Sequence, residues 1–190
     1  LEGEAMEFKF TDIPDITTTY IPVKYINFVS AAESQDDQPA TNMIDASPFT
    51  TWHTKFGKVA KDKAYVTVFD KERELSQIAY DPSGGANGRI KDVEVYVSLD
   101  GKNWTLSGKA TNWSNNKERK ILKLSEPKKA KYVKILATAT YSNGMEEENK
   151  YVSGVRFNYY EDVTKTIKLG NINNDEVIDI LDLSILNKYL

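Results

Sequence analysis

Residues 93–97 read Val-Glu-Val-Tyr-Val, so three valines alternate with polar or amphipathic side chains. This period of two places the valines on one face, as in a strand that has one side against a core. Similar alternation recurs at 66–69, 131–136 and 152–159, and the turn signal Asp100-Gly101 follows the valine stretch. Several short strands without a long helical pattern predict an all-β fold, an antiparallel sandwich or barrel.

The pattern changes after Asp162, where the alternation ends and a short polar connection begins. At the C-terminal end, leucines stand at helical spacing at 183, 186 and 190. We therefore expect four segments along the chain. They are residues 1–20, a linker or extra edge strand; 21–161, the β-sandwich; 162–169, a linker; and 170–190, a loop followed by a short helix.

The composition narrows the classes of function. The 190 residues carry a formal net charge of −3, which argues against a nucleic-acid partner. The chain has no cysteine, so disulfides, zinc–thiolate sites and cysteine nucleophiles are excluded. No apolar run approaches the ~20 residues needed to cross a bilayer, so membrane insertion is not expected. Because the sequence starts at Leu1 and shows no leader, we expect a piece of a longer protein. We also expect the protein to be a monomer.

The C-terminal segment has oxygen donors at the spacing of an EF-hand calcium loop. Counting from Asn171, these donors fall at loop positions 1, 3, 5, 7, 9 and 12. The predicted calcium ligands are Asn171, Asn173, Asp175, the Val177 carbonyl, Asp179 and Asp182. The alternative is a polar turn that caps the following helix.

Residues 168–190 resemble the first calcium repeat of a bacterial dockerin, which implies docking to a cohesin domain. The chain departs from the dockerin pattern at two positions. Asn171 replaces the usual aspartate, and Glu176 replaces the glycine of the sharp turn. Dockerins usually have two repeats, and one is present here. We therefore expect a partial dockerin.

Five motifs in order carry a second resemblance, to the discoidin or coagulation-factor C-type domain and, more narrowly, to family 32 carbohydrate-binding modules. The motifs lie at 40–54, 87–98, 100–104, 113–116 and 130–134. The resemblance extends from about residue 21 to residue 160. It implies a galactose-binding-like β-sandwich of the jelly-roll type, with a ligand site in the loops at one end.

The resemblance also implies which residues contact a sugar. His53 would hydrogen-bond a hydroxyl, Phe56 would form an apolar wall, and Asn87 would add a polar contact. Arg89 would point either to the site or to the opposite strand. Tyr141 would supply a stacking ring, with Tyr151 as its rival. The alternatives are a structural histidine, a core Phe56 and a turn residue at Asn87.

A structural calcium ion is implied near residue 45, with Asp45, Ser47 and Thr50 as ligands. Two departures weaken that set, since Ser47 and Gly154 stand where carboxylates are usual. In the loop before Asn87, Ser83 replaces an arginine that is usual in galactose-binding relatives. An amino sugar or a longer glycan is therefore as suitable a ligand as galactose.

These residues favour non-catalytic binding of glycans that end in galactose or a hexosamine. We expect an extracellular bacterial protein that serves as an accessory module of a glycan-degrading enzyme. The alternative is an adhesive module on the same fold that binds a protein or a cell surface. Catalysis is disfavoured, because His53 is the only histidine and no base or nucleophile partner is apparent by spacing.

Overall fold

The computed structural model describes residues 13–145 and 147–167, and the compact unit that carries the candidate site comprises residues 18–162. Strands dominate the described residues, with two short 3-10 helices and no α-helix among them. The elements are β1 (Ile13–Tyr20), η1 (Val23–Tyr25), β2 (Ile26–Ala31), η2 (Ala40–Ile44), β3 (Trp52–His53), β4 (Ala64–Asp81), β5 (Ile90–Ser98), β6 (Thr105–Ala110), β7 (Lys120–Thr140), β8 (Ser153–Gly154) and β9 (Arg156–Ile167).

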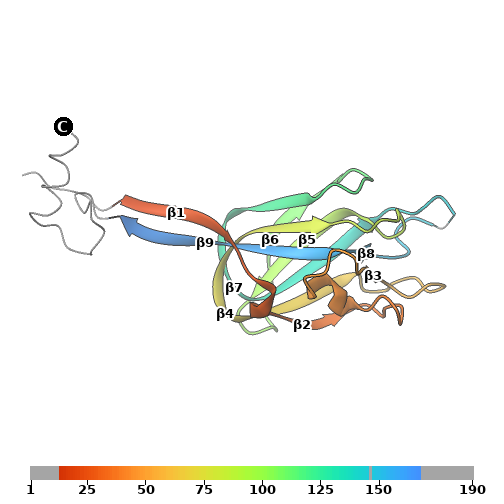
Figure 1. The fold of residues 1–190 in the computed structure, drawn as a ribbon, viewed down its shortest axis with the longest axis horizontal. Coiled ribbons are helices and arrows are strands. Elements are labelled where there is room, and N and C mark those ends of the chain that lie inside the picture. Colours follow the sequence, from red (N-terminus) through yellow and green to blue (C-terminus); the bar gives the residue numbers. More distant parts are fainter. Residues whose placement is uncertain (1–12, 146, 168–190) are drawn as a thin grey trace, which may run out of the picture. The chain divides into compact units, whose positions relative to one another are not determined.

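The long strands β4 and β7 join the two layers of a sandwich (Figure 1). The sheet order is β1-β9-β4-β7-β5-β6, with β2 also paired to β4, and β3 and β8 form a separate pair. The first half of β4 pairs antiparallel with β2, and its second half pairs antiparallel with β9. The register shifts between Val68 and Arg73, where β4 passes from one layer to the other.

Alternating side chains fill the space between the layers. In β5, Val93, Val95 and Val97 are buried, as the period of two predicts. Large aromatic residues complete the core, and the hydroxyl of the buried Tyr65 donates to the Ala40 carbonyl oxygen at 2.9 Å. Trp52 is also buried, whereas Trp104 and Trp113 are half-buried. An all-β antiparallel sandwich is thus confirmed.

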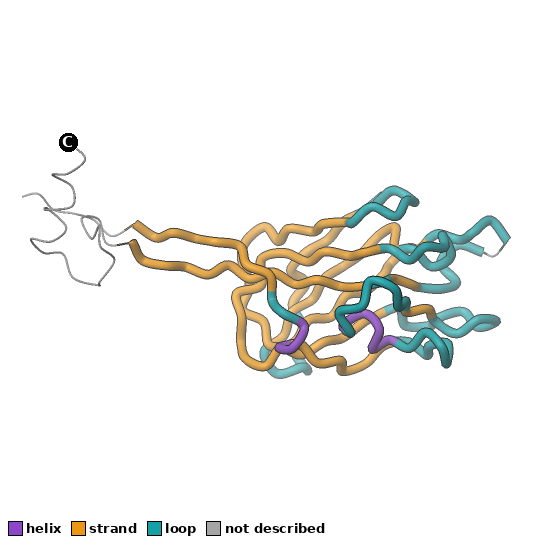
Figure 2. Tube along the Cα trace, in the orientation of Figure 1, coloured by secondary structure: helices purple, strands orange, loops and turns teal. Residues whose placement is uncertain are grey.

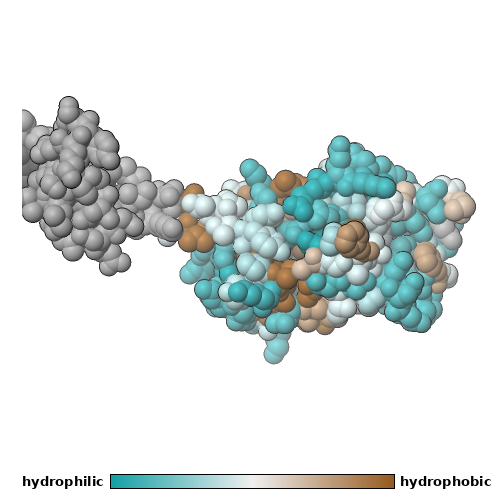
Figure 3. Space-filling model, viewed as in Figure 1, coloured by the Kyte–Doolittle hydropathy of each residue, from teal (hydrophilic) through white to brown (hydrophobic). Residues whose placement is uncertain are grey.

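The described ends of the chain are strands, and an extra edge strand was one of the two expectations for residues 1–20. β1 lies at one edge of the sheet beside β9, and β9 continues to Ile167, into the segment expected to be a linker. The expected calcium loop and helix at 170–190 lie outside the described residues. Within the described part, no helix has the length and apolar character needed to cross a membrane. On the face seen in Figure 3, apolar side chains are scattered among hydrophilic ones.

Candidate functional site

A pocket of about 390 Å³ lies among the loops next to β3 and β8. These loops extend from the end of the sandwich where β3 and β8 are labelled (Figures 1 and 2). We call it the His53 pocket. It is lined by Gln38, Thr51, Trp52, His53, Phe56, Ser83, Gly84, Gly85, Asn87, Asn143 and Ser153.

His53 is fixed in one tautomer by its backbone surroundings. It pairs with Ser153 across β3 and β8, and only 7% of its surface is exposed. Its Nδ1 lies 2.6 Å from the carbonyl oxygen of Thr54. Because a carbonyl can only accept, Nδ1 carries the proton of the neutral ring, and Nε2 is an acceptor. Nε2 is buried and has no hydrogen-bond partner among the described residues.

Burial also keeps the imidazole neutral. Removal from water lowers the pKa of His53 below its usual 6.5, while the backbone oxygens of Thr54 and Asn87 oppose that shift. The interaction with Asn87 falls short of hydrogen-bond geometry, so Nε2 still lacks a partner. An unpaired buried acceptor costs about 1–3 kcal/mol, which a ligand hydroxyl that donates to it would recover.

Phe56 presents an aromatic ring at the pocket. Its surface is 54% exposed, which excludes the alternative of a core phenylalanine. The ring packs against His53 with 4.4 Å between centroids, and edge-on against the buried Tyr151 at 5.6 Å. The Tyr151 hydroxyl accepts a hydrogen bond from the Gly57 backbone N–H at 3.0 Å. The buried Tyr151 therefore packs against Phe56 and supports it, and it is not itself the exposed stacking ring.

Asn87 supplies a second buried polar atom without a partner. Its backbone carbonyl accepts from Ser153 Oγ at 2.7 Å, whereas its side-chain Oδ1 has no hydrogen-bond partner among the described residues. The next residue, Gly88, has a φ of +81°, and its carbonyl accepts from the Ser153 N–H at 2.8 Å. This close approach of Gly88 to β8 brings Asn87 into the same pocket as His53.

Arg89 does not line the pocket, contrary to the expectation that it contacts ligand. It is 7% exposed, and its Nε and one terminal nitrogen donate to the carbonyls of Ser83 and Gly84 at 3.1 and 2.8 Å. The other terminal nitrogen donates to Asn115 Oδ1 at 3.1 Å. Arg89 thus holds the backbone of one pocket wall. Neither the site nor the opposite strand receives its side chain, which is bound by loop residues at 83, 84 and 115.

Tyr141 also lies outside the lining of the pocket. Its hydroxyl donates to the Trp113 carbonyl at 2.7 Å, and the Lys91 ammonium lies 5.5 Å from the centre of its ring. Its backbone exchanges hydrogen bonds of 2.8 Å with Gly88 and Arg89. In the structure Tyr141 holds the Asn87 loop, and its expected role as a stacking ring stays a prediction.

The sequence patterns missed several residues that complete the pocket. Their contributions come from loops and from β8, where no periodic signal marks a side chain as part of a site. The unanticipated lining residues are Gln38, Thr51, Gly84, Gly85, Asn143 and Ser153.

The three ligands expected for a sandwich calcium ion converge in one loop, but they do not fit the ion. The Asp45 carboxylate accepts hydrogen bonds from the Ser47 N–H and the Thr50 hydroxyl, both at 2.7 Å. The Arg156 guanidinium donates to the Ala46 carbonyl at 2.7 Å, which places a positive charge on the same loop. No cluster of three His, Cys, Asp or Glu side chains that could hold a metal ion occurs among the described residues. One carboxylate beside a guanidinium is a poor match for about six to eight oxygens.

The position that would carry a second carboxylate is closed. A Cβ on Gly154 would lie 2.7 Å from the Tyr80 ring and 2.9 Å from the end of Met43. The other six expected calcium ligands lie outside the part of the chain that the structure describes. They are Asn171, Asn173, Asp175, Val177, Asp179 and Asp182.

Comparison with known proteins shows the family to which the domain belongs. The model of the F5/8 type C domain family matches residues 27–153. The chain belongs to this family. In the F5/8 type C domain described here, the match covers the strands and loops that form the His53 pocket.

Solved structures with the same fold include carbohydrate-binding modules from Clostridium perfringens. The family 32 module of NanJ, in complex with galactose, is 26% identical with a TM-score of 0.64, over 76% of this chain and 100% of that one. A family 32 module in complex with GalNAc-β-1,3-galactose is 25% identical with a TM-score of 0.61, over 74% and 99%. Module CBM32-3 of a family 31 glycoside hydrolase has a TM-score of 0.67 at 23% identity, over 75% and 95%.

A curated relative is larger than this domain. Galactose oxidase of Gibberella zeae is 28% identical over 121 residues, which are 61% of this chain and 18% of that protein. The match therefore concerns one part of the oxidase. Family membership and fold together identify this F5/8 type C domain as a binding module rather than a catalytic domain.

Proposed function

We propose that the His53 pocket binds glycans that end in galactose or an N-acetylhexosamine. The observation that carries this proposal is that one pocket brings together the exposed ring of Phe56 and two buried polar atoms that have no hydrogen-bond partner among the described residues, His53 Nε2 and Asn87 Oδ1.

Sugars match both features. A pyranose ring has an apolar CH face that packs on an aromatic ring, and its hydroxyls donate hydrogen bonds. Both partnerless atoms are acceptors in the structure, so they suit two hydroxyl donors. The structures of similar modules with galactose and with GalNAc-β-1,3-galactose support this ligand class. Because the pocket is small and open, we expect modest affinity, between micromolar and millimolar.

The test is a glycan array probed with the wild-type chain and His53→Ala, with Lys102→Gln as a control outside the pocket. We expect binding to galactose- or hexosamine-terminated glycans that His53→Ala removes and Lys102→Gln retains. No binding by the wild type across the array would refute the sugar assignment and favour an adhesive module for protein or cell-surface ligands. Equal binding by His53→Ala would place the sugar elsewhere.

The wider role that we propose is that of a secreted bacterial accessory module of a glycan-degrading enzyme. In support, similar modules come from glycoside hydrolases of Clostridium perfringens. The dockerin-like spacing from Asn171 to Asp182 adds calcium-dependent cohesin docking to the proposal. Calorimetric titration with calcium tests the loop, because Asp175→Ala should remove the binding heat. An unchanged heat in Asp175→Ala would exclude this loop as the calcium site.

A further inference from the structure

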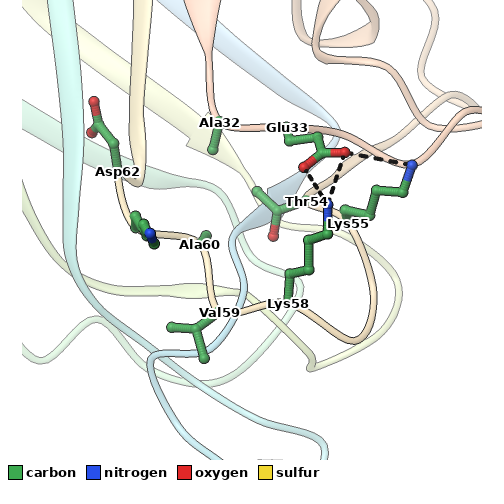
Figure 4. A pocket seen from close by; sticks show the side chains of 9 residues that line it. Ala32, Glu33, Thr54, Lys55, Lys58, Val59, Ala60 and Asp62 are labelled. Atoms are coloured by element: carbon green, nitrogen blue, oxygen red, sulfur yellow. Dashed lines mark hydrogen bonds and ion pairs between the residues drawn. The ribbon is translucent and has the colours of Figure 1, made fainter.

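A second hollow, of about 850 Å³, is lined in part by the segment that carries His53 and Phe56. Thr54 and Lys55 are the two residues between His53 and Phe56, and they line this hollow, which we call the lysine hollow. Figure 4 shows Glu33 facing Lys55 and Lys58, with Val59 and Ala60 on the opposite side. Its lining residues are Ala32, Glu33, Thr54, Lys55, Lys58, Val59, Ala60, Lys61 and Asp62.

Among the described residues that line the hollow, the lysines outnumber the carboxylates. Glu33 alone serves two lysines, with Lys58 Nζ at 3.0 Å and Lys55 Nζ at 3.5 Å from its oxygens. These two ammonium groups lower the pKa of Glu33, so its carboxylate stays ionised. Lys55 also reaches the exposed Asp36 at 3.9 Å, outside the lining.

The two remaining charged residues of the lining, Lys61 and Asp62, form no ion pair with each other in the structure. Asp62 accepts a hydrogen bond from the Ala64 N–H at 3.0 Å, and this contact caps the start of β4. Lys61 makes no hydrogen bond or ion pair with any described residue, so its ammonium is available to a ligand. The lysine hollow therefore offers three ammonium groups against two carboxylates, one shared and one engaged with the backbone.

Part of the lining of the lysine hollow is apolar. Ala32, Ala60 and the 59% exposed Val59 contribute it, so a ligand meets hydrophobic side chains beside the charges. A sugar ring that bears a carboxylate has this combination of a CH face and a negative charge. A free inorganic anion would leave the apolar side chains without a contact.

The two cavities are neighbours along the chain. Phe56 lines the His53 pocket and Lys58 lines the lysine hollow, separated by Gly57 alone. Gly57 has a φ of +77°, a conformation that favours glycine, and Tyr151 holds its N–H. The loop thus turns at Gly57 and presents successive side chains to different cavities.

We propose that the lysine hollow binds an acidic sugar unit next to the terminal sugar held at Phe56. This proposal rests on the proposed sugar site in the His53 pocket. The ligand class is an oligosaccharide with a neutral terminal galactose or hexosamine and a neighbouring unit that bears an anionic group. Lys61 pairs with that group, and Glu33 competes with it for Lys55 and Lys58.

The test compares a galactose-terminated oligosaccharide that contains a glucuronate unit with its carboxyl-reduced counterpart, by calorimetry on the full chain. Because partly exposed ion pairs are weak, we expect the acidic probe to bind about two- to fivefold more tightly. This preference should vanish in Lys61→Gln and at high salt, and it should increase in Glu33→Gln, which frees two lysines. Lys102→Gln, outside both cavities, should retain it.

Each result separates this proposal from the sugar site. If both probes bind equally in the wild type, Lys61→Gln and Glu33→Gln, the lysine hollow has no such role, although the His53 pocket stands. Acidic binding that depends on Lys61 but survives His53→Ala would keep the anionic site and refute the sugar pocket. A sulfated probe that matches the glucuronate one would assign the site to anionic sugars in general, and its failure would assign it to carboxylates.

Discussion

The Nδ1 atom of His53 lies 2.6 Å from the carbonyl oxygen of Thr54, its own neighbour in the chain. This contact fixes the proton on Nδ1 and makes Nε2 an acceptor in the wall of the pocket. A hydroxyl that donates to Nε2 requires the neutral ring, so ligand binding is linked to the protonation of His53.

Sugar binding should weaken at acidic pH. Burial lowers the pKa of His53 below its usual 6.5, so affinity should stay constant from neutral to alkaline pH and fall only below that value. The same group stabilises the fold above its unfolded pKa, and this contribution is lost as the pH falls through the lower folded pKa. Calorimetry between pH 8 and pH 5 measures the first effect, and thermal unfolding measures the second. A pH-independent affinity would contradict the acceptor role of Nε2.

Removal of the Phe56 ring should weaken sugar binding. Aromatic contacts of this kind contribute about 0.5–1.5 kcal/mol, so Phe56→Ala should reduce affinity roughly threefold to tenfold. Phe49→Ala is the matched control, because Phe49 is 93% exposed but does not line the pocket. Equal losses in the two variants, measured by calorimetry, would show that the effect is not specific to the pocket.

Arg89 should support binding without contacting the ligand. Lysine cannot reproduce its three hydrogen bonds, so Arg89→Lys should lower the free energy of unfolding by about 1–3 kcal/mol and weaken sugar affinity. Arg119→Lys is the control, since Arg119 makes a bidentate but exposed pair with Asp81. Denaturant unfolding and calorimetry should be run on both. Unchanged stability in Arg89→Lys would show that the hydrogen bonds of Arg89 to the Ser83 and Gly84 carbonyls do not hold this wall of the pocket.

Gly88 should tolerate alanine less well than Gly144. Both have positive φ, +81° and +85°, and in that region alanine costs about 1–2 kcal/mol. A Cβ on Gly88 would also lie 2.9 Å from the Ser153 backbone nitrogen, whereas a Cβ on Gly144 meets open space. Chemical denaturation should therefore give a clearly lower free energy of unfolding for Gly88→Ala than for Gly144→Ala. Equal stabilities would mean that β8 can move away from Gly88.

The Asp45 loop should keep its stability without calcium. Its carboxylate and the Arg156 guanidinium already hold the backbone, so EDTA should leave the melting temperature unchanged in an Asp175→Ala, Asp179→Ala variant of the full chain. The two substitutions remove ligands of the expected C-terminal calcium loop. A lower melting temperature on chelation would restore a calcium site in the sandwich. Arg156→Gln should lower it with or without EDTA.

The sequence anticipated the residues that recur with a period or a motif. Alternation at Val93, Val95 and Val97 predicted the sandwich, and the motif around Trp52 and Asn87 singled out His53, Phe56 and Asn87, which the fold gathers in one pocket. Arg89 and Tyr141 do not line this pocket, and the sequence could not show that because residue type and spacing do not give the direction of a side chain. Arginine and tyrosine side chains can donate hydrogen bonds either to a ligand or to a backbone carbonyl. Here hydrogen bonds to backbone carbonyls decide the direction in which each side chain points.

Strand periodicity alone determined the all-β class of this chain, because burial on one face of a sheet requires an apolar residue at every second position. Only the tertiary structure decided which polar atoms remain unpaired. Hydrogen bonding is satisfied between residues far apart in sequence, as when Ser153 reaches the Asn87 carbonyl. The partnerless His53 Nε2 and Asn87 Oδ1, and the lysines that share Glu33, are therefore features of the folded chain that no local pattern encodes.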